Sequence, residues 1–216
     1  MQLHEKYRPI VWGEVIGQDK AVAALQAVGA RGWGGRAYFL SGQSGVGKTT
    51  LARLIAAEVA DGFYVAELDA TDLTPAKLRE VESTMGLCGG GRGGRAWIVN
   101  EAHGLRRDTL RQLLVLLERL PSHVAVIFTT TKDGQESLFE DEADAHPLLS
   151  RCVVVSLTSQ GLALRFAHRA REIAQLEGLD GQPPAAYLAR IKHHKNNLRA
   201  LLQDVDKGHF ARSEAP

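Results

Sequence analysis

Residues 42–49 read Gly42-Gln43-Ser44-Gly45-Val46-Gly47-Lys48-Thr49, which fits the phosphate-binding P-loop pattern. Residues 37–40 before it form an apolar run of strand length, and residues 49–60 after it repeat apolar side chains at helical spacing. The loop's N–H groups and the positive helix N-terminus can hold phosphates, Lys48 can reach the outer ones, and the Thr49 hydroxyl can bind Mg²⁺. A glycine-rich turn without a ligand is the alternative, and the agreement of strand, loop and helix disfavours it.

Length, charge and cysteine content limit the class of protein. The 216 residues are enough for one core, or for one core and a small satellite. The net charge of +1 means that any DNA contact must come from a local basic patch. Two cysteines without metal-ligand spacing, a polar N-terminus and no apolar run of about 20 residues predict a cytoplasmic protein with no membrane partner.

The remaining chain alternates between strand-like and helix-like segments, which predicts a parallel sheet with ligands at the carboxyl ends of its strands. Further strands are expected at 63–68, 96–99, 124–128 and 153–155, and helices at 75–85, 108–120, 161–176, 184–194 and 197–207. The strand signal ends near Ser156, so we expect domains at 1–156 and 157–211 and a tail at 212–216. Residues 86–94 and the acidic stretch 133–145 are expected to be solvated loops.

Asn100 and Glu101 follow the third predicted strand, in a segment that resembles a Walker B motif. That motif usually has Asp before Glu, where Asp orders Mg²⁺ and Glu positions the attacking water. Asn100 keeps an acceptor oxygen but loses a charge worth a few kcal/mol at about 4 Å from a cation, less through water. We therefore expect weaker Mg²⁺ binding, with chemistry retained through Glu101. The Mg²⁺ requirement should relax in Asn100→Asp. A polar strand end without a metal is the alternative.

Two further polar features have both a structural and a functional interpretation. Thr129, Thr130 and Thr131 end the next predicted strand, either as β-favouring residues or with one hydroxyl orienting the water. Arg151 precedes the last predicted strand, either as a surface ion pair or as an arginine finger for a neighbouring subunit's nucleotide.

In this order, the motifs resemble those of the AAA+ ATPases of clamp loaders, both replication factor C small subunits and the motor subunits of the bacterial loader. The resemblance covers most of the chain. It includes the segments Glu5 to Pro9, Glu14 to Gln18, Glu67 to Asp72, Ser150 to Cys152 and Asn196 to Arg199. It implies an α/β fold, in which a five-stranded parallel sheet in an αβα sandwich precedes a small helical lid. It also implies a third, helical collar domain, for which this sequence has no segment.

The resemblance assigns roles to individual residues. Catalysis would fall to Lys48, Glu101, Thr131 as sensor 1 with Thr130 as second choice, Arg151 in trans, and Arg199 as sensor 2. ATP would be held by Tyr7, Arg8, Pro9, Val15, Ile16, Gly42, Ser44, Gly45, Val46, Gly47, Lys48, Thr49, Thr50 and Arg199. Thr49 and Asn100 would serve Mg²⁺, largely through water.

The resemblance further implies an oligomer around duplex DNA that loads a sliding clamp or remodels a protein–DNA complex. Arg106, Arg107 and Arg111, at the start of the helix after the Walker B segment, would contact phosphates, with a solvated helix face as an equal alternative. Two other functions compete with this one. One is a Holliday-junction or recombination ATPase, and the other is a non-hydrolysing ATP-binding scaffold, for which Asn100 is the best argument.

Overall fold

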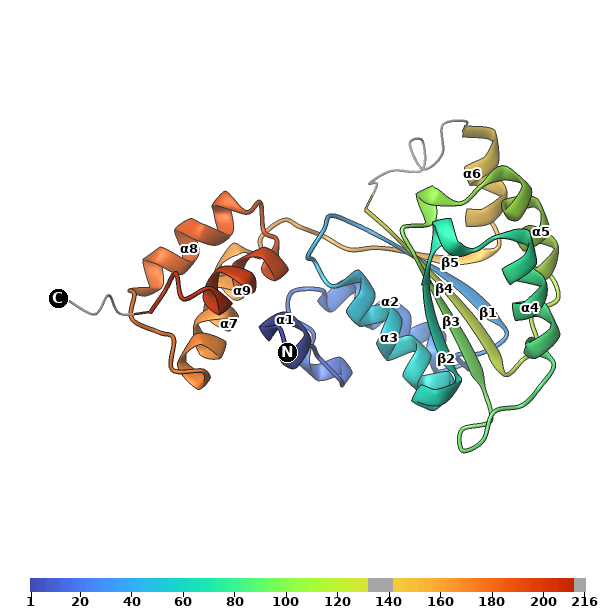
Figure 1. Cartoon of the computed structure of the whole chain (residues 1–216), viewed down its shortest axis with the longest axis horizontal. Helices are drawn as coiled ribbons and strands as arrows, with labels where there is room; N and C mark the ends of the chain where they lie inside the picture. Colours follow the sequence, from blue (N-terminus) through green and yellow to red (C-terminus); the bar gives the residue numbers. More distant parts are fainter. Residues whose placement is uncertain (132–141, 212–216) are drawn as a thin grey trace. The chain divides into compact units, whose positions relative to one another are not determined.

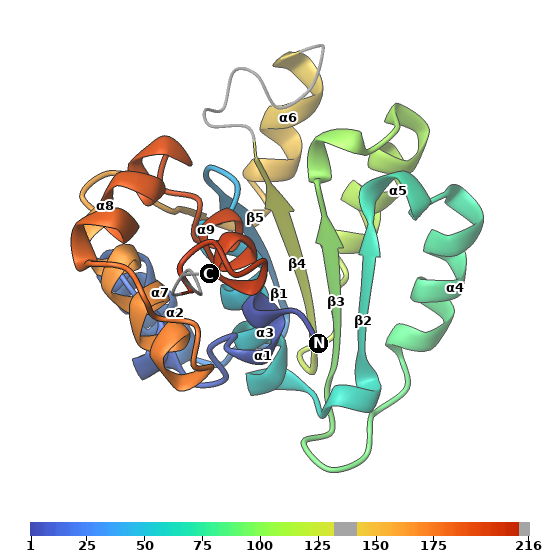
Figure 2. The same cartoon turned by 60° about the vertical axis from the view of Figure 1, so that its left-hand side comes forward.

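A computed structural model describes residues 1–131 and 142–211, and for residues 142–145 it describes the backbone alone. In this part of the chain, five strands form one parallel sheet in the order β2-β3-β4-β1-β5 (Figures 1 and 2). The strands are β1 (Arg36–Ser41), β2 (Val65–Asp69), β3 (Arg95–Asn100), β4 (Val124–Thr130) and β5 (Cys152–Ser156). The predicted five-stranded parallel α/β fold is confirmed.

The described helices are α1 (Leu3–Lys6), α2 (Asp19–Gly29), α3 (Lys48–Val59), α4 (Pro75–Met85), α5 (Arg107–Leu117), α6 (Glu142–Leu149), α7 (Ala163–Leu176), α8 (Pro184–His193) and α9 (Leu198–Asp206). Six of these helices match the predicted ones, and α1, α2 and α6 were not predicted. Short 3₁₀ turns complete the connections, among them η4 (Ala102–Gly104) directly after the Walker B segment. Of the predicted acidic loop, residues 142–145 instead belong to α6, and residues 133–141 lie outside the described residues, as does the predicted tail.

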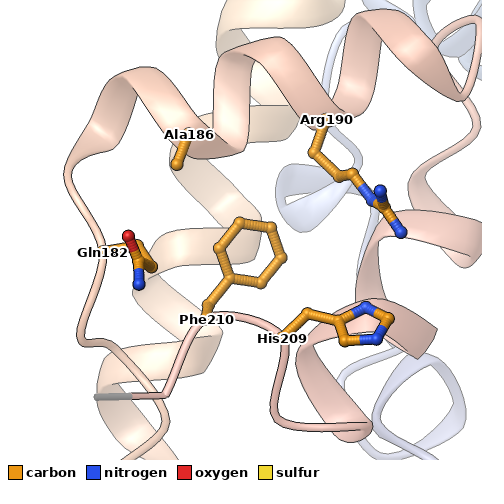
Figure 3. Close-up of a pocket in the computed structure, with 5 residues that line it drawn as sticks. All are labelled: Gln182, Ala186, Arg190, His209 and Phe210. Atoms are coloured by element: carbon orange, nitrogen blue, oxygen red, sulfur yellow. The ribbon is translucent and has the colours of Figure 1, made fainter. Parts of the chain in front are cut away.

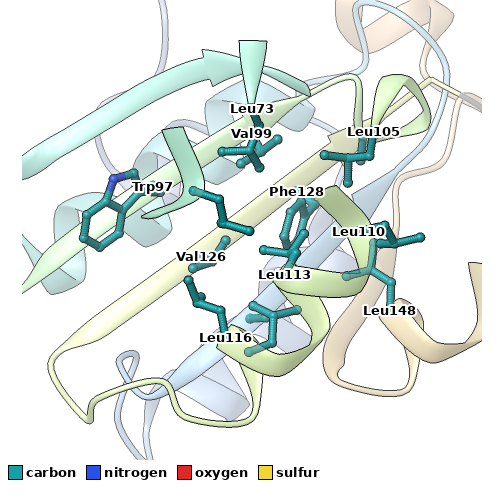
Figure 4. Packing of buried hydrophobic residues seen from close by; sticks show 14 of the residues in the cluster. Leu73, Trp97, Val99, Leu105, Leu110, Leu113, Leu116, Val126, Phe128 and Leu148 are labelled. Atoms are coloured by element: carbon teal, nitrogen blue, oxygen red, sulfur yellow. The ribbon is translucent and has the colours of Figure 1, made fainter. Parts of the chain in front are cut away.

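Each face of the sheet is covered by helices that bury a leucine-rich stripe. Figure 4 shows Leu110, Leu113 and Leu116 of α5 lying over Val126 and Phe128 of β4. On the opposite face, α3 contacts β1, β3 and β4 and buries Leu51, Leu54 and Ile55 completely or almost completely. Since α3 begins at Lys48, this packing fixes the helix that follows the P-loop against the middle of the sheet.

The chain forms two compact units, which we describe separately. One unit holds the sheet and its helices, residues 20–42 and 48–157; the other holds residues 1–19, 43–47 and 158–216. The N-terminal segment, which we predicted as part of the first domain, groups with the C-terminal helices instead because Leu3 packs into their hydrophobic cluster with Phe166, Tyr187 and Leu201. No helix in the described part of the chain is long and apolar enough to cross a membrane.

A buried carboxylate ties the C-terminal helices together. Asp204 of α9 lies 2.5 Å from Nε of Arg190, 2.6 Å from Nε2 of His194 and 3.3 Å from Nδ1 of His209. Figure 3 shows Arg190 and His209 on the same side of a pocket of about 350 Å³ beside Phe210. Burial alone would raise the pKa of Asp204, but the hydrogen bonds from Arg190 and His194 outweigh it and lower the pKa to about 2.

The lowered pKa predicts acid-sensitive stability. A carboxyl group with a depressed native pKa stabilises the fold above its unfolded value near 4, by about 2 kcal/mol for this shift, and the stabilisation disappears as the pH falls toward 2. Asp204→Asn should therefore lower the free energy of unfolding at pH 7 by about that amount or more, and the difference from the native protein should close by pH 2. Denaturant unfolding at several pH values measures it. Asp206→Asn, an exposed change in the same helix, is the control.

Candidate active site

The predicted catalytic segments follow three adjacent strands. Strand β3 ends at Asn100, which Glu101 follows. Its neighbour β4 ends at Thr130, which Thr131 follows. The next strand, β1, leads into the P-loop. Parallel strands place these ends at one edge of the sheet, which is where ligands bind in such folds. The topology therefore brings together the polar segments that the sequence singled out.

The P-loop has the backbone that phosphate binding requires. Gly42, Gly45 and Gly47 have φ values of 144°, 78° and 110°, which side chains other than glycine rarely adopt. Lys48 is 7% exposed, and its Nζ donates a hydrogen bond to the Gly42 carbonyl oxygen at 2.6 Å, so the lysine folds back along the loop. A Cβ added to Gly47 would meet nothing within 4 Å, which leaves open space beside the loop for a ligand.

Within the smaller unit, the P-loop touches the predicted sensor 2 segment. A Cβ at Gly45 would lie 1.9 Å from Oδ1 of Asn197, so only glycine fits against this side chain. Asn197 caps α9, since its Oδ1 accepts a hydrogen bond from the Ala200 N–H at 3.1 Å. Arg199 follows two residues later in the first turn of α9 and is exposed. The structure therefore brings the segment that carries Arg199 to the P-loop.

Gln18 fixes the P-loop backbone, a role that the sequence did not reveal. Its side chain is 2% exposed and makes three hydrogen bonds. Nε2 donates to the carbonyl oxygens of Val46 at 3.2 Å and Thr158 at 2.9 Å, and Oε1 accepts from the Thr158 N–H at 3.1 Å. One buried amide thus joins the P-loop to the start of the C-terminal segment.

Gln18→Ala is expected to lower the free energy of unfolding by roughly 2–4 kcal/mol, because it leaves buried backbone groups without partners. The nucleotide affinity should fall as well, since the Val46 carbonyl is no longer held. Thermal unfolding and titration with an ATP analogue measure the two effects. Gln175→Ala, an exposed change at a glutamine of α7, is the matched control, and equal behaviour of the two variants would contradict the role given to Gln18.

Glu101 occupies a strained position. Its φ and ψ are 52° and 51°, in the left-handed region that costs a residue with a Cβ about 1–2 kcal/mol. Its Oε2 accepts a hydrogen bond from the Thr131 hydroxyl at 3.0 Å and lies 3.4 Å from Nδ1 of His103. Among the described non-glycine residues, Lys195 and Asn196 also have a positive φ, and Glu101 is the carboxylate among the three. Such strain is common at functional sites, which agrees with the motif.

The three threonines have different partners. Thr131 reaches Glu101, Thr130 lies 3.2 Å from Nδ1 of His103, and Thr129 donates to Oδ1 of Asn100 at 2.9 Å. Thr131, the first choice for sensor 1, is therefore the one in contact with the predicted catalytic carboxylate. The His103 ring, to which the sequence prediction gave no role, lies near both Thr130 and Glu101.

The donor atoms at this edge fit a magnesium ion. Thr49 lies in the first turn of α3, and Asn100 offers an amide oxygen, both hard oxygen ligands of the kind that Mg²⁺ prefers. In the described residues, no group of three or more His, Cys, Asp or Glu side chains could hold a metal by itself. A metal at this edge would thus depend on the phosphates of a bound nucleotide.

Arg151 is placed apart from these groups. Its guanidinium pairs with Glu118, with Nε 3.1 Å from Oε1, and its NH1 donates to the Pro147 carbonyl oxygen at 2.9 Å. Both side chains of the pair are partly exposed, so the pair contributes little to stability. Neither partner belongs to the predicted nucleotide site.

The N-terminal segment predicted to hold adenine lies against the C-terminal helices. Tyr7 and Ile16 pack onto their hydrophobic cluster, and the Tyr7 hydroxyl donates a hydrogen bond to Glu177. This hydrogen bond, with some burial, raises the pKa of Tyr7. Arg8 is paired with Glu5, and Pro9 and Val15 are partly buried. These residues stay predicted ligands.

The predicted DNA contacts are exposed residues at the start of one helix. Arg106 precedes α5, and Arg107 and Arg111 lie in its first two turns, all three exposed. Their positions suit both a phosphate contact and a solvated face.

The sequence is similar to a family model and to several known proteins. Residues 38–144 match the model of the ATPase family associated with various cellular activities (AAA). The chain is 27% identical to DNA polymerase III subunit tau of Escherichia coli over an alignment of 231 residues. This alignment covers 95% of this chain and 34% of that protein. It is 28% identical to the replication factor C large subunit of Methanocella arvoryzae over 210 residues, 93% of this chain and 35% of that protein.

Solved structures agree on the fold. A Thermotoga maritima RuvB variant, T158V, has a TM-score of 0.70 at 22% identity, covering 92% of this chain and 64% of that one. The Thermotoga maritima RuvB Holliday junction branch migration motor has a TM-score of 0.67 at 23% identity with the same coverage. The chain spans about a third of the length of the curated relatives and less than two thirds of these solved chains. The parallel sheet and its helices therefore have the same fold as these solved structures.

Proposed function

We propose that this chain hydrolyses ATP in an oligomer that acts on DNA during replication. The match of residues 38–144 to the AAA family model and the similarity to a DNA polymerase III subunit and a replication factor C subunit support this proposal. The task would be to load a sliding clamp or to remodel a related protein–DNA complex. The observation that carries the proposal is the strained Glu101, bonded to Thr131 at the sheet edge that also holds the P-loop.

Each residue would perform a separate part of the hydrolysis. Lys48 and the P-loop N–H groups bind the phosphates, and Arg199 adds positive charge at the γ-phosphate. Glu101 orients the water that attacks this phosphate, and Thr131 holds the Glu101 carboxylate by its hydrogen bond. Thr49 and Asn100 would hold Mg²⁺, which neutralises charge on the phosphates when bound. Arg151 would serve the nucleotide of a neighbouring subunit.

Lys48→Ala tests nucleotide binding. Loss of the ammonium removes a charge-assisted contact worth about 1.5–3 kcal/mol, so the affinity for a fluorescent ATP analogue should fall by roughly 10- to 100-fold. Fluorescence titration measures it. Lys20→Ala, at an exposed lysine of α2, should bind as the native protein does. Equal affinities of the native protein and Lys48→Ala would contradict the P-loop assignment.

The replication role is tested by ATP turnover in the presence of partners. Primed DNA together with a sliding clamp should stimulate turnover more than either alone. Neutral substitutions at Arg106, Arg107 and Arg111 should lower the DNA affinity equally for all sequences and reduce its salt dependence.

Two competing functions have their own supporting observations. The RuvB structures share the fold, and a branch-migration activity on four-way junctions without any clamp would favour that function. Asn100 in place of the Walker B aspartate supports a scaffold that binds ATP without hydrolysing it. Absence of turnover under every condition, with ATP binding retained, would favour the scaffold.

A further inference from the structure

The Asn100 side chain is held from both sides by neighbouring strands. On β2, Oε1 of Glu67 accepts a hydrogen bond from the Asn100 Nδ2 at 2.8 Å. On β4, the Thr129 hydroxyl donates to the Asn100 Oδ1 at 2.9 Å. Glu67 also pairs with Arg53 of α3, whose Nε lies 2.9 Å from its second carboxylate oxygen. The amide at the Walker B position thus belongs to a network that spans three adjacent strands.

We propose that Glu67 is the positioning residue of the Walker B site: its carboxylate orients the Asn100 amide and supplies the negative charge that asparagine lacks. This inference rests on the proposed function, because it concerns Mg²⁺ bound with ATP. It places on β2 the negative charge that a Walker B aspartate would carry on β3.

Orientation is the first argument. An ionised carboxylate only accepts hydrogen bonds, so Glu67 forces the nitrogen of the amide toward β2. The amide oxygen then faces β4, the strand that separates β3 from β1 and its P-loop. Thr129, which is 2% exposed, holds the oxygen there with a donated hydrogen bond. Without Glu67, the amide could turn its nitrogen to this side, and a nitrogen that carries two hydrogens cannot bind a cation.

Charge is the second argument. The Glu67 side chain is 30% exposed and is held on the α3 face of the sheet, where Arg53 reaches it. A hydrogen bond to a carboxylate polarises the amide, so its oxygen becomes a stronger acceptor and ligand. The negative charge is therefore felt at the cation through Asn100, although it resides one strand farther away.

Arg53 offers a way to separate this role from a structural one. If Glu67 mattered only as the partner of Arg53, removal of either residue would have the same consequence. If Glu67 acts through Asn100, removal of Arg53 leaves the carboxylate and its hydrogen bond to the amide in place.

Four variants of the full chain test the inference: Glu67→Gln, Arg53→Gln, Asn100→Asp, and the double variant Glu67→Gln/Asn100→Asp. The double variant moves the charge from β2 to β3 and keeps a donor opposite an acceptor. The readout is the binding of Mn²⁺, monitored by electron paramagnetic resonance, to the protein saturated with adenylyl imidodiphosphate. Thermal unfolding with and without the metal serves as a second measurement.

Glu67→Gln should weaken Mn²⁺ binding by roughly three- to tenfold, Arg53→Gln by less than about twofold, and the double variant should restore the native affinity or exceed it. Asn100→Asp alone sets two carboxylates side by side, so it should melt at a lower temperature without metal and gain more from Mn²⁺ than the native protein does.

Two results would overturn the inference while the proposed function stands: unchanged Mn²⁺ affinity in Glu67→Gln, or equal losses in Glu67→Gln and Arg53→Gln. If the native protein binds the ATP analogue neither with nor without divalent metal, the proposed function fails, and this inference fails with it.

Discussion

Arg151→Ala is expected to lower the ATPase rate of the assembled protein by about 10³-fold or more, the effect of removing an arginine finger from a phosphoryl-transfer site. Arg151, which precedes β5, is held by Glu118 at the end of α5 and by the Pro147 carbonyl oxygen of α6. These partners compete weakly for a guanidinium, since the pair is partly exposed. A γ-phosphate presented by a neighbouring chain would therefore displace Glu118 easily. Nucleotide affinity of the single chain should stay unchanged.

Mixing variants distinguishes action in trans from action within one chain. Arg151→Ala chains retain a complete P-loop, and Lys48→Ala chains retain Arg151. A mixture of the two should recover part of the turnover that each lacks alone. Arg119→Ala, at an exposed arginine in the same region, should have little effect. A mixture as inactive as its components would contradict a finger that acts between subunits.

Glu101→Gln is expected to lower turnover by roughly 10²- to 10⁴-fold while ATP stays bound, because the amide cannot accept a proton from the attacking water. Glutamine keeps an oxygen that can accept the Thr131 hydrogen bond, so the local structure should persist. A single-turnover assay with labelled ATP separates the chemical step from binding.

Two further variants check this assignment. Thr131→Val removes the hydroxyl that holds the Glu101 carboxylate and should give a smaller loss of turnover than Glu101→Gln. Glu80→Gln, an exposed glutamate of α4 that pairs with Lys77, should turn over ATP at the native rate. Substantial turnover by Glu101→Gln would require another group to orient the water.

The sequence predicts the strands and helices well where local signals are strong. For α4, predicted and observed limits coincide at Pro75 and Met85, because Thr74 caps the helix with a hydrogen bond from the Lys77 N–H, a proline follows, and Gly86 ends it. The P-loop was equally clear, since glycine spacing, lysine and threonine leave few alternatives.

Contacts between segments far apart in the sequence could not be predicted from local sequence patterns. The grouping of residues 1–19 with the C-terminal helices depends on Leu3 and on ion pairs such as that of Lys6 with Glu177 at 2.6 Å, for which no local pattern exists. The hydrogen bond between Glu67 and Asn100 depends on the β2–β3 register, which pairs Asp69 with Asn100. The alternation of Glu67 and Asp69 around Leu68 was the available signal, because it sets both carboxylates on one face.

At residue 101, the left-handed backbone and the proposed chemistry favour different amino acids. A glycine would adopt the same φ and ψ without the steric penalty of a Cβ, so a purely thermal selection would favour it over glutamate. The same change would delete the carboxylate that the proposed function requires for turnover. A search for heat-resistant variants of this protein would thus enrich inactive ones at residue 101 unless ATP consumption were selected at the same time.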